Sequence, residues 1–156
     1  MFGTEAALVK LVVRQLRGGK SPWGTVQVVT EWDYRNGRTD VLARCKAGTL
    51  VAFEAKLTRW QVACDQAYRN TAYASRTYVV LPPDIALRAL AAEAFFRSRR
   101  IGLCSASPDG LQVIIEPPVV SPLMQWVADL AHRSFNGLKN DNAERRRRRA
   151  GSLCGA

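Results

Sequence analysis

Hydrophobic residues recur first at helical spacing and then at strand spacing. Leu8, Val9, Val12 and Leu16 fall on one helical face, and Gly18-Gly19 then ends the run. Three segments rich in β-branched and aromatic residues follow, separated by the turn sequences Asn36-Gly37 and Lys46-Ala47-Gly48; they cover residues 26–34, 39–45 and 49–57. The pattern predicts one helix followed by a three-stranded meander.

The rest of the chain alternates between helical and strand patterns. The expected helices are residues 58–74, 84–100 and 121–135, and the expected strands are 77–81, 101–105 and 111–115. The opening order is therefore α-β-β-β-α-β, which predicts an α/β fold with a mixed central sheet flanked by helices. We expect a single domain over residues 1–136 and a flexible basic tail over residues 137–156.

The composition fits this picture. The chain has 156 residues, of which 47% are hydrophobic and 23% charged, and this excludes a collagen-like, wholly disordered or disulfide-scaffold protein. No apolar run approaches the roughly 20 residues that span a bilayer, so we expect no membrane partner and a cytoplasmic protein. Four scattered cysteines without a CxxC pair and a single histidine, His132, argue against a structural zinc site and favour reduced thiols.

The charge favours a polyanionic partner. The net charge is +10, of which residues 144–156 contribute +4 through five arginines and one glutamate. The preceding residues therefore still carry +6. Such a balance favours nucleic acid first and an anionic membrane second, although solubility alone is the competing explanation.

The strongest chemical pattern lies on the second and third predicted strands. Asp40 follows the first hairpin turn, and Glu54 and Lys56 end the next strand. Because side chains alternate across a strand, one face is expected to be core and the other to end in charge. Paired as a hairpin, the strands bring Asp40 and Glu54 to one point, which suits a hard cation with oxygen ligands. A lysine beside them can orient water or meet charge developing on a phosphate.

This arrangement resembles the PD-(D/E)XK nuclease superfamily, with its restriction-endonuclease-like fold, over residues 4–82. The resemblance implies that Asp40, Glu54 and the backbone carbonyl of Ala55 bind magnesium or manganese. It implies that Lys56 positions or activates the attacking water. The expected function is a metal-dependent DNA endonuclease, and the alternative is a catalytically inactive nucleic-acid-binding module of the same fold. Without Asp40, the Glu-x-Lys sequence would be read as a solvated strand end.

Relatives often add a glutamate on the first helix, and some add a glutamine on the helix after the metal-binding strand. Here Glu5 and Gln66 fit those positions. Glu5 also fits an acid that complements the helix dipole, and Gln66 also fits a hydrogen bond to backbone. The sequence departs from the family pattern at two places: Thr39 precedes the first acid where proline is usual, and Asn70 stands where tyrosine follows the glutamine.

Other residues are candidates for weaker roles. Asp33 is a rival for the first acid, although it precedes the hairpin turn, and His132 is expected to be structural. Trp60 and Tyr68 suit contacts with bases or, for Trp60, core packing. No specificity domain is visible, so we expect recognition through DNA structure, a homodimer or a partner protein. The expected DNA contacts are Arg69, Arg76, Arg145, Arg146, Arg147, Arg148 and Arg149.

Overall fold

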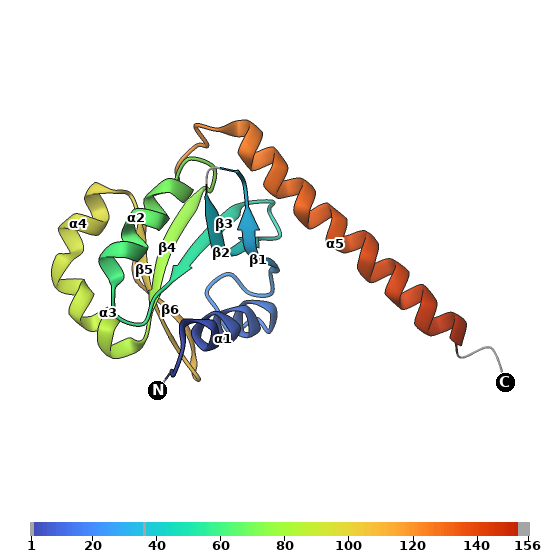
Figure 1. Cartoon of the computed structure of the whole chain (residues 1–156), viewed down its shortest axis with the longest axis horizontal. Helices are drawn as coiled ribbons and strands as arrows, with labels where there is room; N and C mark the ends of the chain where they lie inside the picture. The colour runs from blue at the N-terminus through green and yellow to red at the C-terminus, as the bar shows by residue number, and fades with distance from the viewer. Residues whose placement is uncertain (1, 36, 153–156) are drawn as a thin grey trace.

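A six-stranded mixed sheet forms the centre of the molecule (Figure 1). The structure is a computed structural model that describes residues 2–35 and 37–152, with side chains as far as Leu138. The strands lie side by side in chain order, β1-β2-β3-β4-β5-β6. Their bounds are β1 Gln27–Asp33, β2 Arg38–Arg44, β3 Leu50–Ala55, β4 Arg76–Leu81, β5 Gly102–Ser107 and β6 Gly110–Ile115.

The direction of the strands changes where helices connect them. The pairs β1–β2, β2–β3 and β5–β6 are antiparallel, whereas β3–β4 and β4–β5 are parallel. A parallel pair needs a crossover, and α2 (Trp60–Asn70) supplies it between β3 and β4. The predicted mixed α/β sheet and the opening element order are thereby confirmed.

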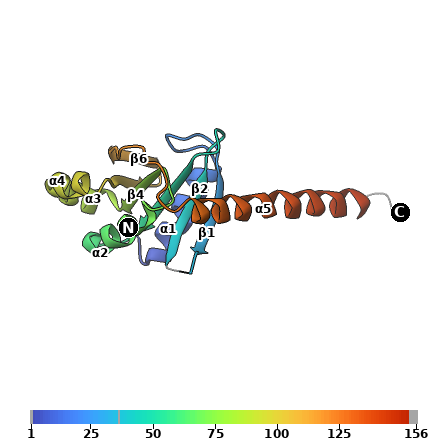
Figure 2. The same cartoon turned by 90° about the horizontal axis from the view of Figure 1, so that it is seen from above.

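Helices cover both faces of the sheet. Helix α1 (Glu5–Arg17) packs Leu8, Val12 and Leu16 on one face. On the other face lie α2, α3 (Pro83–Ala89), α4 (Glu93–Ser98) and the first half of α5 (Gln125–Ser152). Figure 2 shows α5 extending away from the sheet.

Burial on both faces corrects one expectation about β3. All six of its residues are buried. Val51 and Phe53 pack with α1, while Leu50 and Ala52 pack with the first half of α5. The second face of β3 is therefore also core, because helices that follow later in the chain fold back over it.

Two helices differ most from their predicted extents. The helix expected over residues 84–100 is interrupted at Ala92, where φ is −100° and ψ is 29°. The bend lets Ala86 of α3 and Phe96 of α4 pack into the same cluster. The last helix, expected to end at residue 135, continues to Ser152. Its later part contains the run Arg145–Arg149, and arginine is a good helix former that can propagate a helix already nucleated by its docked first half.

Several smaller predictions can be placed in the structure. Tyr34 N–H donates to the carbonyl of Gly37 at 3.1 Å, closing the β1–β2 connection, while Asn36 itself lies outside the described residues. Cys45, Cys64 and Cys104 are free thiols, as expected, and Cys154 lies outside the described residues. No described helix is both long and apolar enough to cross a membrane.

Candidate active site

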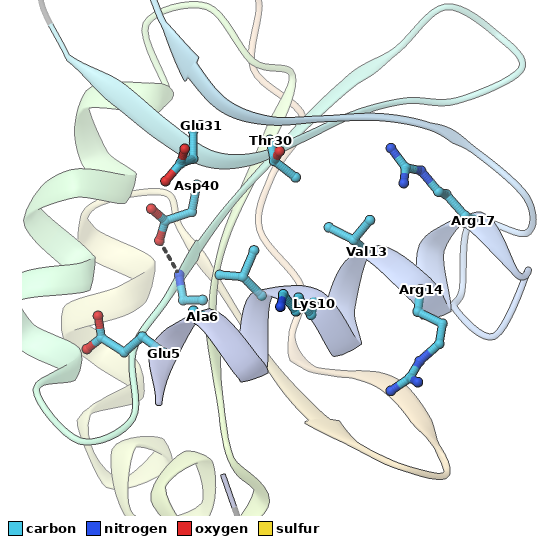
Figure 3. Close-up of a pocket in the computed structure, with 11 residues that line it drawn as sticks. Glu5, Ala6, Lys10, Val13, Arg14, Arg17, Thr30, Glu31 and Asp40 are labelled. Atoms are coloured by element: carbon cyan, nitrogen blue, oxygen red, sulfur yellow. Dashed lines mark hydrogen bonds between the residues drawn. The ribbon is translucent and has the colours of Figure 1, made fainter. Parts of the chain in front are cut away.

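Strands β2 and β3 separate at the level of Asp40. Their ladder ends at the pair Val41 and Phe53. One residue further on, the Asp40 carboxylate accepts a hydrogen bond from the backbone N–H of Ala55 at 3.0 Å (dashed in Figure 3). Strand β1 is irregular at the same level, because Glu31, opposite Asp40, has a φ of 48°. The distorted backbone leaves the acid facing a cavity instead of a neighbouring strand.

Glu54 is a fully buried acid beside Asp40. Its side chain has no exposed area, one carboxylate oxygen (Oε1) accepts a hydrogen bond from Asn70 Nδ2 at 2.7 Å, and the other (Oε2) has no partner among the described residues. Burial, and next the negative charge of Asp40, raise the pKa of Glu54 to about 8. The predicted convergence of these two acids is therefore present, although Glu54 is buried and not at a charged strand end.

Lys56 pairs with Glu5, which lines the same cavity as Asp40. The Nζ atom of Lys56 lies 3.1 Å from Oε2 of Glu5, with the side chains 21% and 47% exposed. Glu5 is also in the first turn of α1, whose N-cap Thr4 accepts a hydrogen bond from Ala7 N–H. The structure thus combines the two sequence interpretations of Glu5, since it lies at a helix N-terminus and also pairs with the candidate catalytic lysine.

The two departures from the family pattern contact each other. Thr39 Oγ1 donates to Asn70 Oδ1 at 3.0 Å and also lies 2.6 Å from Tyr73 Oη. The hydroxyl of Tyr34 donates to the same Asn70 oxygen at 3.3 Å. Thr39 and Asn70 are both buried, and Asn70 holds Glu54 with its amide nitrogen. Sequence reasoning noted each substitution but did not connect them, because 31 residues separate them.

Not every predicted residue joins the acids. Gln66 lies four residues before Asn70 on the same face of α2, and its Oε1 atom is buried without a partner among the described residues. Arg69 is exposed on α2. Arg76 begins β4, pairs in register with Val51 and lies 3.6 Å from Glu116. Its side chain is on the sheet face opposite Glu54, so the structure does not bring Arg76 to the acids.

The remaining candidates have other surroundings. Asp33 accepts a hydrogen bond from the backbone N–H of Arg35 at 3.0 Å, which makes it a turn residue and not the first acid. Trp60 stacks on Phe96, with ring centroids 5.5 Å apart, and therefore packs in the core. His132 lies 3.5 Å from Arg44 and fits its expected structural role. The side chains of Arg145, Arg146, Arg147, Arg148 and Arg149 lie outside the described residues.

A cavity of about 760 Å³ opens beside Asp40. Glu5, Asp40 and Ala55 line one end of it, with Thr30 and Glu31 on β1. The rest of the lining is a stripe of α1 that includes the three cations Lys10, Arg14 and Arg17 (Figure 3). Sequence reasoning missed these cations. Their spacing of four and three residues was the available signal, since it places them on one helical face.

The donor set fits a hard divalent cation. Two carboxylates converge, and the buried Glu54 Oε2 has no partner among the described residues. Oxygen ligands of this kind suit magnesium or manganese. Within the described part of the chain, no cluster of three or more histidine, cysteine, aspartate or glutamate side chains is placed to hold a metal. A cation would therefore depend on Asp40 and Glu54 together with backbone oxygen and water.

Comparisons with known proteins find similar folds but no similar sequence. No protein-family model matches the chain, and no curated protein of similar sequence is found. A protein of unknown function from Silicibacter pomeroyi, SPO1766, is similar with a TM-score of 0.58 and 19% identity, over 91% of this chain and 96% of that one. The structure of an EndoMS–dsDNA complex is similar with a TM-score of 0.51 and 19% identity, over 69% of this chain and 46% of that one.

A repair endonuclease from Pyrococcus abyssi has a TM-score of only 0.39, at 19% identity, over 76% of this chain and 49% of that one. At such low identities a likeness concerns architecture and not activity. The mixed six-stranded sheet flanked by helices is the α/β architecture that the sequence predicted, and the likeness to these structures concerns that architecture.

Proposed function

We propose that the chain is a metal-dependent DNA endonuclease that hydrolyses phosphodiester bonds. The observation that carries the proposal is the convergence of Asp40 and Glu54 where β2 and β3 separate, with Lys56 directly following the strand. The basic composition and the likeness of the fold to a protein solved with double-stranded DNA support DNA as the partner. Magnesium or manganese is the proposed cofactor, held by Asp40, Glu54 and the carbonyl of Ala55.

Each residue of the site has a distinct part in this mechanism. When bound, a divalent cation polarises the phosphate and lowers the pKa of water. Asp40 is fixed by the Ala55 N–H, so its second oxygen can face the cation without a change of rotamer. Asn70 fixes Glu54 in the same way. Both acids are thereby oriented before substrate arrives, which avoids reorganisation during the reaction.

Lys56 is placed to act on the nucleophile. Its ammonium group is partly buried and is held by Glu5 at 3.1 Å. In that position it can orient the attacking water and stabilise negative charge that develops on the phosphate. Glu5 then serves as a positioning residue, because it holds the ammonium group beside the cavity that Glu5 and Asp40 line. Gln66 is proposed as a further polar group of the site, on the face of α2 that also presents Asn70.

The test is cleavage of plasmid, single-stranded and branched DNA with magnesium, manganese or chelator. Asp40→Asn and Glu54→Gln should lose cleavage and metal binding together, because each removes a charged oxygen. Lys56→Ala should bind metal and DNA but cleave about 10²- to 10⁴-fold more slowly. Asp33→Asn is the matched control and should cleave like the parent protein, since Asp33 belongs to a turn.

Two results would contradict the proposal. If Asp40→Asn and Lys56→Ala cleave as fast as the parent, these residues are not catalytic. If the parent never cleaves and binds DNA equally well in chelator, the chain is a binding module of the same fold. The fully buried state of Glu54 is the observation that favours this second candidate, because a protonated carboxyl group can be a stable part of the core.

A further inference from the structure

The cavity beside Asp40 is long, open and lined by charges of opposite sign at its two ends. Glu5, Glu31 and Asp40 lie at the end where α1 begins, and Arg14 and Arg17 lie in the last turn of the helix. Lys10 stands between the two groups. A helix of 13 residues is about 20 Å long, so the cavity is longer than any single phosphate group needs.

The three cations are free to bind a ligand. All three are exposed, and none forms an ion pair with a described residue. Arg17 donates only one long hydrogen bond, of 3.4 Å, to the carbonyl of Val28. Arg14 and Arg17 leave the helix toward opposite sides (Figure 3). A chain lying along the stripe between them would therefore meet a guanidinium group on either flank.

Stabilisation of the helix dipole does not account for this arrangement by itself. The dipole favours cations within the last turn, where Arg14 and Arg17 lie. It gives no reason for Lys10, which lies in the middle of the helix, nor for the fact that all three line the cavity that also contains Asp40. A polymer of phosphates would meet all three cations along the length of the cavity, whereas a single phosphate would not.

We propose that a nucleic-acid strand lies along the stripe of α1 that carries Lys10, Arg14 and Arg17, with its phosphates bound by these cations. The strand runs from the last turn of α1 to Asp40, where one phosphodiester reaches the acids. The destination of the strand rests on the proposed nuclease function; the binding path itself does not. Val9 and Val13, partly buried between the cations, form the apolar floor beneath the strand.

The experiment measures binding without cleavage. Fluorescence anisotropy of labelled single-stranded and duplex oligonucleotides is recorded in chelator across a salt series. The test variant carries Lys10→Ala, Arg14→Ala and Arg17→Ala. The control variant carries Lys46→Ala, Arg88→Ala and Arg133→Ala, which removes the same charge from exposed positions on the β2–β3 turn, α3 and α5. Circular dichroism and thermal melting verify that both variants fold.

The test variant should show a log–log salt slope shallower by about 2 to 3 units than the parent, because each phosphate contact contributes about 0.9 for duplex and about 0.7 for single strands. The salt slope of the control variant should fall much less. An equal fall of the slope in both variants would contradict the path and indicate binding by a diffuse basic surface. Loss of binding to phosphatidylserine vesicles equal to the loss of binding to DNA would also overturn it, in favour of a general anion site.

These outcomes separate the path from the nuclease proposal. Suppose that the parent does not cleave DNA, but that the salt slope of binding falls selectively in the test variant. The binding path along α1 is then supported and the nuclease function is contradicted. Suppose instead that the parent cleaves DNA and that the test variant keeps the parental salt slope. The nuclease function is then supported and the binding path along α1 is contradicted.

Discussion

At the scale of single residues, Glu54 shows how burial sets chemistry. The ionised form of a carboxyl group with no exposed area is not hydrated, so burial disfavours ionisation. The negative charge of Asp40 nearby disfavours it further by repulsion. Metal-free protein is therefore expected to keep Glu54 protonated at neutral pH, since its pKa is raised to about 8. A bound cation would reverse this preference, because ligation requires the ionised form.

The raised pKa predicts how stability depends on pH. Between the ordinary value of 4.5 and about 8, the folded protein binds more protons at Glu54 than the unfolded chain does. Stability in chelator should therefore fall as pH rises through this window, by up to about 1.4 kcal/mol per pH unit. Urea denaturation of the parent and of Glu54→Gln across this pH range measures how the free energy of unfolding depends on pH. The variant, which cannot ionise there, should show a flatter profile; parallel profiles would mean that Glu54 is not the titrating group.

At the scale of elements, a buried polar contact joins helix α2 to two strands. Asn70 of α2 reaches Thr39 on β2 through its oxygen and Glu54 on β3 through its nitrogen. Tyr73 extends the contact through the Thr39 hydroxyl. Buried networks of this kind are stabilising only while every member has a partner. The network therefore fixes both the packing of α2 and the orientation of Glu54.

Asn70→Ala tests this network. Its removal leaves buried groups without partners and should lower the free energy of unfolding by about 1–3 kcal/mol in urea denaturation. It should also raise the pKa of Glu54 further, because the hydrogen bond from Asn70 opposes the rise.

Tyr73→Phe is the matched control for Asn70→Ala. It removes the far end of the network and should lower the free energy of unfolding by about 1 kcal/mol without changing the pKa of Glu54. Equal effects of both variants on that titration would contradict a specific role for Asn70.

At the scale of the whole molecule, α5 has two parts with different surroundings. Its first half docks on the sheet through buried residues that include Val127, Ala131 and Phe135. Its second half projects away from the sheet and carries Arg145–Arg149 in its sequence (Figure 1). The division of the chain into a domain and a basic tail stays a prediction, now with a helical backbone as far as Ser152.

Truncation after Asn142 tests what the projecting half contributes. The variant keeps the α5 residues that are buried within the described part of the chain, so its melting temperature should match that of the parent. It loses five arginines, and the log–log salt slope of duplex DNA binding should fall by about 4 to 5 units. Cleavage at saturating DNA should persist, because the candidate site lies in the sheet. A parental slope in the truncated protein would mean that these arginines are free in the complex.

The sequence by itself determined the element order and the meeting of Asp40 with Glu54. Helical and strand periods are local patterns, and a short hairpin turn fixes the register of the strands on either side of it. The two acids lie on such a hairpin, so their approach follows from positions that are close along the chain. The order α-β-β-β-α-β was predictable for the same reason.

Only the tertiary structure decided what surrounds those acids. The burial of Glu54 depends on helices that arrive later in the chain, and its raised pKa depends on that burial. The contact of Thr39 with Asn70 and the placement of the α1 cations beside Asp40 join segments that are distant in sequence. Local periodicity shows which face of an element is apolar, but not which element will cover it, because packing is settled by the whole chain.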